Sequence, residues 1–188
     1  MTTSTRYSFT IRDYARMRSA GILAEDDRVE LLDGEVRQMS PIGPFHAALV
    51  NRLTAILTRL LGDTAIVSIQ NPIQLNDYSE PQPDVVIMHP RDDYYAHAHP
   101  RPDDILVVIE IADSSIDYDR DEKMPRYAEA GISEAWLIDV AQQQIEHYTQ
   151  PRNGIYRQKV LLTTEDQIQS VQYPQIMFAI RTLFPSAP

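Results

Sequence analysis

The chain has 188 residues, with 17 basic and 27 acidic side chains, a formal charge of −10 and no cysteine. Disulfides, thiolate catalysis and cysteine-based zinc sites are therefore excluded. The acidic balance argues against nucleic-acid binding by phosphate neutralisation alone, since that needs clustered Lys and Arg. A polyanionic substrate would need a local basic patch or a bridging cation.

The length predicts a single domain over residues 1–188. The first twenty residues lack the apolar core and cleavage site of a secretory signal. No apolar run approaches the length of a membrane span. We therefore expect a cytoplasmic protein.

Capping and turn signals predict the first elements. Ser8 or Thr10 can cap a short helix that ends near Gly21. Asp33-Gly34 stands between two extended runs, which predicts a hairpin with a two-residue type I′ turn. Register then places the residues on either side of this turn directly opposite one another.

A long helix and two extended segments are expected next. The helix ends at Gly62 and presents one apolar face, made of Leu49, Leu53, Ile56, Leu57 and Leu60. An extended run over 65–75 is interrupted at Pro72. A short buried strand then begins at Asp84, and a polar loop covers 90–103.

The run ILVVIEIA, residues 105–112, reads as a strand buried on both faces. A polar turn follows, and then a helix with Pro125 in its first turn and Gly131 as its stop. Three strands are expected after that helix. The order of elements predicts an α/β or α+β layer structure.

Glu110 interrupts the apolar run, although burying a charge costs several kcal/mol. The run has no polar alternation that would place this residue on an exposed face. A perturbed carboxylate in a cleft is a candidate for a functional site. Glu110 is therefore interpreted as functional.

Each of the other candidate site residues also has an ordinary structural interpretation. Glu30 can pair across the hairpin with Arg37, and Asp84 can cap a turn. Lys123 can be a solvated helix residue, and His46 a surface residue at a helix start. Grouped together, the carboxylates would suit Mg²⁺, which prefers hard oxygen ligands, and a lysine beside them could stabilise developing negative charge.

Two histidines in the polar loop, His97 and His99, have the spacing of metal ligands but no evident third partner. A flexible loop is the better reading. Asp113, Ser114 and Ser115 are read as turn and capping groups, and Trp136 and Tyr127 as core aromatics.

Several stretches together resemble the Uma-two family of restriction-endonuclease-like proteins, within the PD-(D/E)XK nuclease superfamily. They are VELLDGEV, PIGPFHAALVNRL, PQPDVVIM, ILVVIEIADSSIDYDRDEK, PRYAEAGISEAWLIDV and IEHY. The resemblance runs from about Tyr14 to Tyr148. It implies a restriction-endonuclease-like α/β core (about 14–162), a central mixed β-sheet flanked by helices, with an N-terminal helix and β-hairpin.

The resemblance also implies a divalent-metal site. Asp84 matches the family's aspartate and Glu110 the acidic residue of the (D/E)XK element, while Glu30 matches the glutamate of its ELLDGE stretch. His46 matches a histidine at a helix start, and Lys123 a lysine on the helix after the strand. One position departs from the superfamily pattern: Ala112 stands two residues after Glu110, where the motif has its lysine.

The resulting hypothesis is a Mg²⁺-dependent endonuclease acting on DNA, with Mn²⁺ as a substitute and a homodimer as the expected assembly. Asp84 and Glu110 would bind the cation and Glu30 would be a further ligand or position a water. Lys123 would steady that water or the charge at phosphorus, and His46 would transfer a proton or contact phosphate.

Two alternatives stay open. A non-catalytic descendant of the fold would bind a protein or nucleic-acid partner, as the missing in-strand lysine and the acidic surface suggest. A hydrolase of small phosphoesters would also suit the charge. P-loop and dinucleotide-binding motifs are absent.

Overall fold

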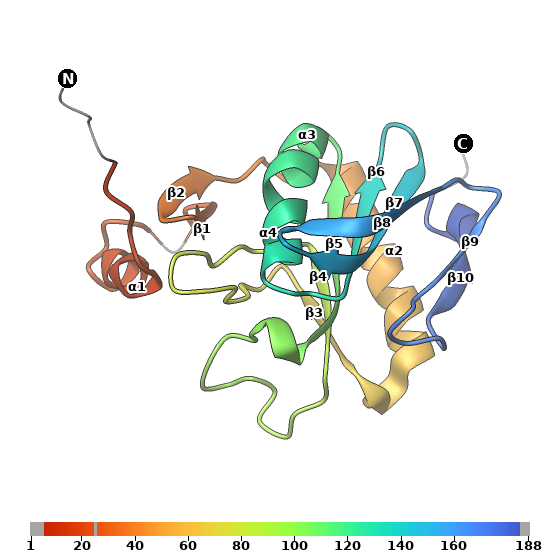
Figure 1. Ribbon diagram of the computed structural model, residues 1–188, viewed down its shortest axis with the longest axis horizontal. Coiled ribbons are helices and arrows are strands. Elements are labelled where there is room, and N and C mark those ends of the chain that lie inside the picture. The colour runs from red at the N-terminus through yellow and green to blue at the C-terminus, as the bar shows by residue number, and fades with distance from the viewer. Residues whose placement is uncertain (1–5, 25, 185–188) are drawn as a thin grey trace.

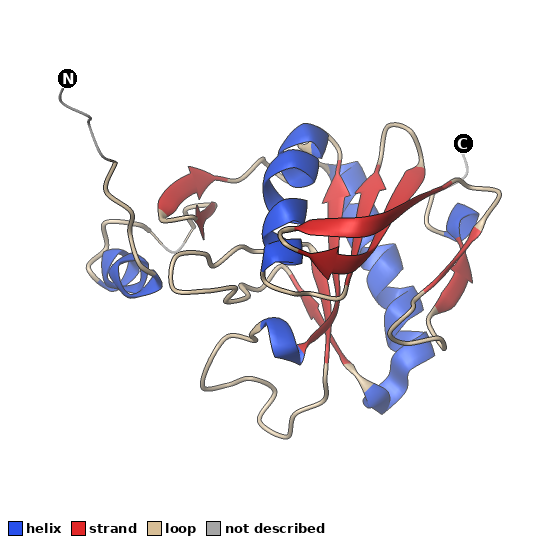
Figure 2. Cartoon of the chain, viewed as in Figure 1, coloured by secondary structure: helices blue, strands red, loops and turns tan. Residues whose placement is uncertain are grey.

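The computed structural model describes residues 6–24 and 26–184. At its centre lies a six-stranded mixed sheet with helices on both faces (Figures 1 and 2). Across the sheet the strands run in the order β3 (Ile66–Ile69), β4 (Val85–Met88), β5 (Ile105–Ala112), β6 (Glu134–Asp139), β7 (Gln144–Arg152) and β8 (Ile155–Leu162). β5 and β6 are parallel, and the other neighbours in this sheet are antiparallel. The expected mixed sheet is confirmed.

The N-terminal helix and hairpin lie to one side of the sheet (Figure 1). Helix α1 (Ile11–Ser19) is capped by Thr10, whose side chain accepts a hydrogen bond from the backbone of Asp13. The hairpin consists of β1 (Val29–Leu32) and β2 (Glu35–Gln38) in the predicted register. Asp33 and Gly34 both have positive φ, as a type I′ turn requires.

Helix α2 (Pro44–Leu61) covers one face of the sheet and ends at Gly62, as predicted. Its leucines pack against side chains of alternate residues from β4 to β7. β5 is buried along its whole length because this layer covers one of its faces and a second layer covers the other. The predicted two-sided burial of this strand is confirmed.

The second layer is a helical segment from Ile116 to Glu129, and here the sequence analysis was wrong about residues 116–122. They are not a polar turn. They form the one-turn helix α3 (Ile116–Tyr118) and a π-helical turn over Asp119–Lys123, which continues into α4 (Met124–Glu129). A π-turn is often found at functional sites. This segment is the crossover between parallel strands β5 and β6.

The chain after β8 adds a two-stranded sheet of β9 (Gln167–Gln169) and β10 (Met177–Ala179), which the sequence analysis did not predict. Short 3₁₀ turns occur at Gly62–Thr64, Pro102–Asp104 and Ile180–Thr182. The core on the α2 side includes buried residues from Ile168 to Phe184. The packed core therefore extends beyond the expected boundary near residue 162.

Candidate active site

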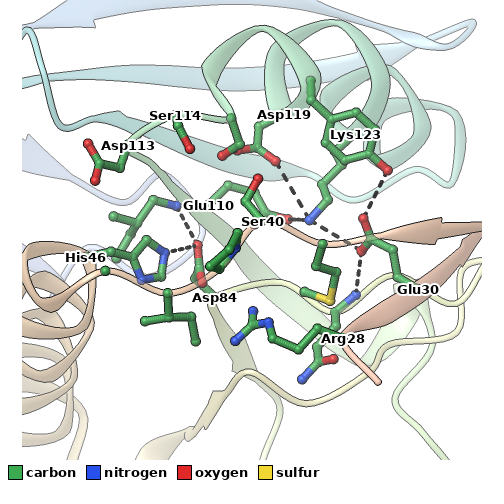
Figure 3. Close-up of a pocket in the computed structure, with 18 of the residues that line it drawn as sticks. Arg28, Glu30, Ser40, His46, Asp84, Glu110, Asp113, Ser114, Asp119 and Lys123 are labelled. Atoms are coloured by element: carbon green, nitrogen blue, oxygen red, sulfur yellow. Dashed lines mark hydrogen bonds and ion pairs between the residues drawn. The ribbon is translucent and has the colours of Figure 1, made fainter. Parts of the chain in front are cut away.

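Two neighbouring strands bring Asp84 and Glu110 to the same place. The antiparallel register of β4 and β5 pairs Val85 with Ile109. Asp84 directly precedes Val85 and Glu110 directly follows Ile109, so an extension of this register would bring the two acidic residues side by side. Both side chains line a single cavity of about 220 Å³ (Figure 3).

Lys123 enters this cavity from the π-helical turn (Figure 3). Its Nζ lies 3.2 Å from Oε1 of Glu110, 3.4 Å from Oε2 of Glu30 and 3.7 Å from Oδ1 of Asp119. The side chain is only 5% exposed. Burial acts to lower the pKa of Lys123, but the surrounding carboxylates outweigh it and hold the pKa above its usual value.

Glu110 is 2% exposed and has two partners on one oxygen. The Tyr127 hydroxyl donates to Oε1 at 2.5 Å, and the Lys123 ammonium donates to the same atom at 3.2 Å. Burial raises the pKa of Glu110 well above its ordinary value, although the charge of Lys123 opposes that shift. Burial likewise raises the pKa of Asp119.

Glu30 points from β1 toward Lys123 rather than across the hairpin. Its Oε1 accepts from the Tyr118 hydroxyl at 3.0 Å, and its Oε2 accepts from the backbone N–H of Gln82 at 3.1 Å. Arg37 stands opposite Glu30 in the register but pairs with Glu35 and Glu122 instead. The cross-hairpin ion pair considered from sequence is therefore absent from the described residues.

Asp84 and His46 form a second pair on the cavity wall. His46, in the first turn of α2, places Nε2 3.0 Å from Oδ2 of Asp84. The Ile111 N–H donates to the same oxygen at 2.9 Å, and Gln70 contacts Oδ1 at 3.3 Å. Burial acts to raise the pKa of Asp84, but these donors hold it below its usual value. The hydrogen bond with Asp84 raises the pKa of His46.

Charge in the cavity is strongly unbalanced. The cavity is lined by five carboxylates, those of Glu30, Asp84, Glu110, Asp113 and Asp119. Only two basic side chains, Arg28 and Lys123, line it with them, together with His46. Oxygen donors in excess of nearby positive charge are the chemistry that suits a hard divalent cation. Mg²⁺ commonly takes one or two protein carboxylates and fills its other positions with water and substrate oxygens.

The arrangement of these donors limits what can bind. Within residues 6–24 and 26–184, no three His, Asp or Glu side chains are grouped as a metal site. Glu30 is engaged by Lys123, Tyr118 and the backbone. Asp84 and Glu110 therefore provide two carboxylates as candidate ligands, fewer than a grouped three-residue site would, with Lys123 beside Glu110.

All five residues predicted from the sequence, Glu30, His46, Asp84, Glu110 and Lys123, line this one cavity. His97 and His99 lie exposed in the loop before β5 and do not line it. The sequence analysis did not single out Asp119 or Tyr118. It interpreted Tyr127 as a core aromatic, and the structure confirms that position. Asp119, Lys123 and Tyr127 have the four-residue spacing of one helical face, but the residues before Lys123 were interpreted as a polar turn.

A mixed sheet flanked by helices, with Asp84, Glu110 and Lys123 in one cavity, is the arrangement expected from the resemblance to restriction-endonuclease-like proteins. The model of the Uma2 family, described as "Putative restriction endonuclease", matches residues 11–181. The chain belongs to this family.

A solved structure shares the fold. A protein from Anabaena variabilis, described as a putative nuclease belonging to DUF820, matches with a TM-score of 0.73 and 15% sequence identity. The match covers 94% of this chain and 97% of the other. A search of the curated proteins finds no relative of this chain. In the part of the chain that the structure describes, no helix is long and apolar enough to cross a membrane.

Proposed function

We propose that this protein is a Mg²⁺-dependent endonuclease that hydrolyses phosphodiester bonds in DNA. The observation that carries the proposal is that Asp84, Glu110 and Lys123 all line one cavity. Membership of the Uma2 family supports it. Because the chain has a net charge of −10, a bridging cation is the simplest means of bringing a polyanion to this acidic cavity.

Each residue has a role that follows from its contacts. Asp84 and Glu110 would hold the cation. Bound Mg²⁺ would supply polarisation of the scissile phosphate and a lowered pKa for a water. Lys123 would stabilise negative charge that develops on the phosphate oxygens, because its ammonium is fixed in a water-poor site.

Glu30 and His46 act around that centre. Glu30 orients Lys123, and it remains a predicted additional ligand or water-positioning group. His46 holds Asp84 through Nε2, while Nδ1 has no partner among the described residues. Since Nδ1 is fully buried, the role we propose for His46 in this geometry is to position Asp84.

Cleavage of plasmid and branched DNA tests the proposal. We expect nicking with Mg²⁺ or Mn²⁺, no nicking in EDTA, and loss of activity in Asp84→Ala and Glu110→Ala. Cleavage that persists unchanged in both variants, or that never occurs, would refute the proposal. Light scattering on the same preparation tests the expected homodimer.

One observation favours a second candidate, a nuclease-fold module that binds without catalysis. The Lys123 ammonium already contacts three carboxylates, Glu30, Glu110 and Asp119, and so occupies part of the role of a metal ion. Titration calorimetry with Mg²⁺ separates the two candidates. Measurable cation binding that Asp84→Ala abolishes favours the endonuclease, and no binding to the folded chain favours the module.

A further inference from the structure

Tyr127 has a buried hydroxyl directed at the proposed metal site. The residue lies on α4, one helical turn after Lys123, and its side chain is fully buried in the core on that face of the sheet. A buried phenol needs a hydrogen-bond partner. Here the partner is Oε1 of Glu110, at 2.5 Å.

Both protein donors to Glu110 meet the same carboxylate oxygen. Lys123 also donates to Oε1, at 3.2 Å. Among the described residues, Oε2 of Glu110 receives no hydrogen bond, and it is not among the fully buried side-chain atoms that lack a partner. Since Glu110 lines the cavity, Oε2 is the oxygen that faces it.

We propose that Tyr127 is a positioning residue which, together with Lys123, fixes Oε1 of Glu110 and so presents Oε2 to a divalent cation. The inference rests on the proposed endonuclease function and assigns Tyr127 a part in it. Without the phenol, the carboxylate would keep one donor and could rotate about its last torsion, which is broad and soft. Groups that orient a metal ligand typically contribute 10–100-fold in affinity or activity.

The test compares Tyr127→Phe with Tyr156→Phe. Each substitution removes one hydroxyl, and Tyr156 contacts the same side of the core but donates to the backbone oxygen of Ile132, away from the cavity. Mn²⁺ dissociation constants are measured by calorimetry in the full-length chain, and thermal unfolding is measured in EDTA. The Mg²⁺ concentration that gives half-maximal DNA cleavage and the KM for DNA complete the comparison.

For Tyr127→Phe we expect the Mn²⁺ dissociation constant and the half-maximal Mg²⁺ concentration each to rise about tenfold or more. The KM for DNA at saturating Mg²⁺ should not change. Tyr156→Phe should lower the unfolding temperature and leave both cation measurements at the wild-type values. This pattern separates positioning of Glu110 from a general loss of stability.

Three results would overturn the inference. Wild-type cation affinity in folded Tyr127→Phe, in a chain that cleaves DNA, would refute the role of Tyr127 alone. An equal loss of affinity in Tyr156→Phe would show that the effect is structural and would also refute it. A wild-type chain that neither binds Mn²⁺ nor cleaves DNA would refute the proposed function together with this inference.

Discussion

Replacement of Lys123 by methionine is expected to destabilise the fold strongly, because one ammonium holds three buried carboxylates. The contacts run to Glu30, Glu110 and Asp119, and the lysine side chain is 5% exposed. Removing one partner of a buried ion pair costs roughly 3–5 kcal/mol, since the remaining charge stays buried without compensation. For a chain of this size, 1 kcal/mol corresponds to about 2–4 °C, so the melting temperature should fall by about 6–20 °C.

Glu110→Gln should behave in the opposite way. Lys123 retains Glu30 and Asp119, and one desolvated charge is removed. Stability in metal-free buffer should therefore stay the same or rise. The two substitutions should change stability in opposite directions, because Lys123 is the one positive charge in contact with three carboxylates.

The loss in Lys123→Met should also depend on pH. Burial raises the pKa of Glu110 and Asp119 even in the presence of the lysine, and without it the rise should be greater. A group with a raised pKa binds more protons in the folded state, so stability falls as pH increases above the unfolded value of 4.5 for Glu. The destabilisation should be smaller at pH 5 than at pH 8.

Urea unfolding in EDTA at both pH values measures these effects. Lys159→Met is the matched control, because Lys159 is 48% exposed and contacts only Glu146 as an acidic partner in the described residues. Because Lys159 is half-exposed and Glu146 keeps its ion pair with Arg120, the loss of Lys159 should cost about 0–1 kcal/mol. The reasoning is refuted if Lys123→Met at pH 8 loses no more stability than Lys159→Met, or if Glu110→Gln loses as much as Lys123→Met.

Three further predictions concern the scaffold. Leu53→Ala should lower the free energy of unfolding in urea by roughly 2–5 kcal/mol, because truncation of this fully buried side chain leaves a cavity. The folded variant should still bind Mn²⁺ as the wild type does. Gly34→Ala should lower the melting temperature, since φ is +76° and the added Cβ would lie 2.5 Å from Cβ of Ser8; an unchanged temperature would contradict the described turn. Burial acts to raise the pKa of Glu134, but hydrogen bonds from His147, Trp136 and the 170–172 segment hold it below its ordinary value. Its contribution is present above the unfolded pKa of 4.5 and is lost as pH falls through the folded pKa, so between pH 6 and pH 3 the wild type should lose more stability than Glu134→Gln.

The sequence was sufficient to predict structure where the chemistry of a few neighbouring residues determines the backbone conformation. Asp33-Gly34 fixes the hairpin register because both residues accept positive φ. The long apolar run of β5 predicts burial because no polar alternation interrupts it. Glu110 could be recognised for the same reason, as one charge where the pattern allows none.

The segment 116–123 could not be predicted in the same way. Its helix buries Asp119 and Lys123 but exposes Asp117 and Asp121, so charged side chains lie on both faces and no apolar face marks the helix. Only the opposing carboxylates Glu30 and Glu110, distant in the sequence, make that burial possible. The hydrogen bond from Tyr127 to Glu110 could not be predicted for a related reason, because the partner of a core hydroxyl depends on where the helix begins.

The position of Lys123 on the crossover between β5 and β6 has a consequence for biosynthesis. A parallel pair closes only after the whole connection has been made, and the Tyr118–Glu30 contact joins positions 88 residues apart. An incomplete or misfolded chain therefore has no assembled acid–lysine centre. The cavity that contains Glu30, Glu110 and Lys123 is therefore assembled only once each molecule has folded.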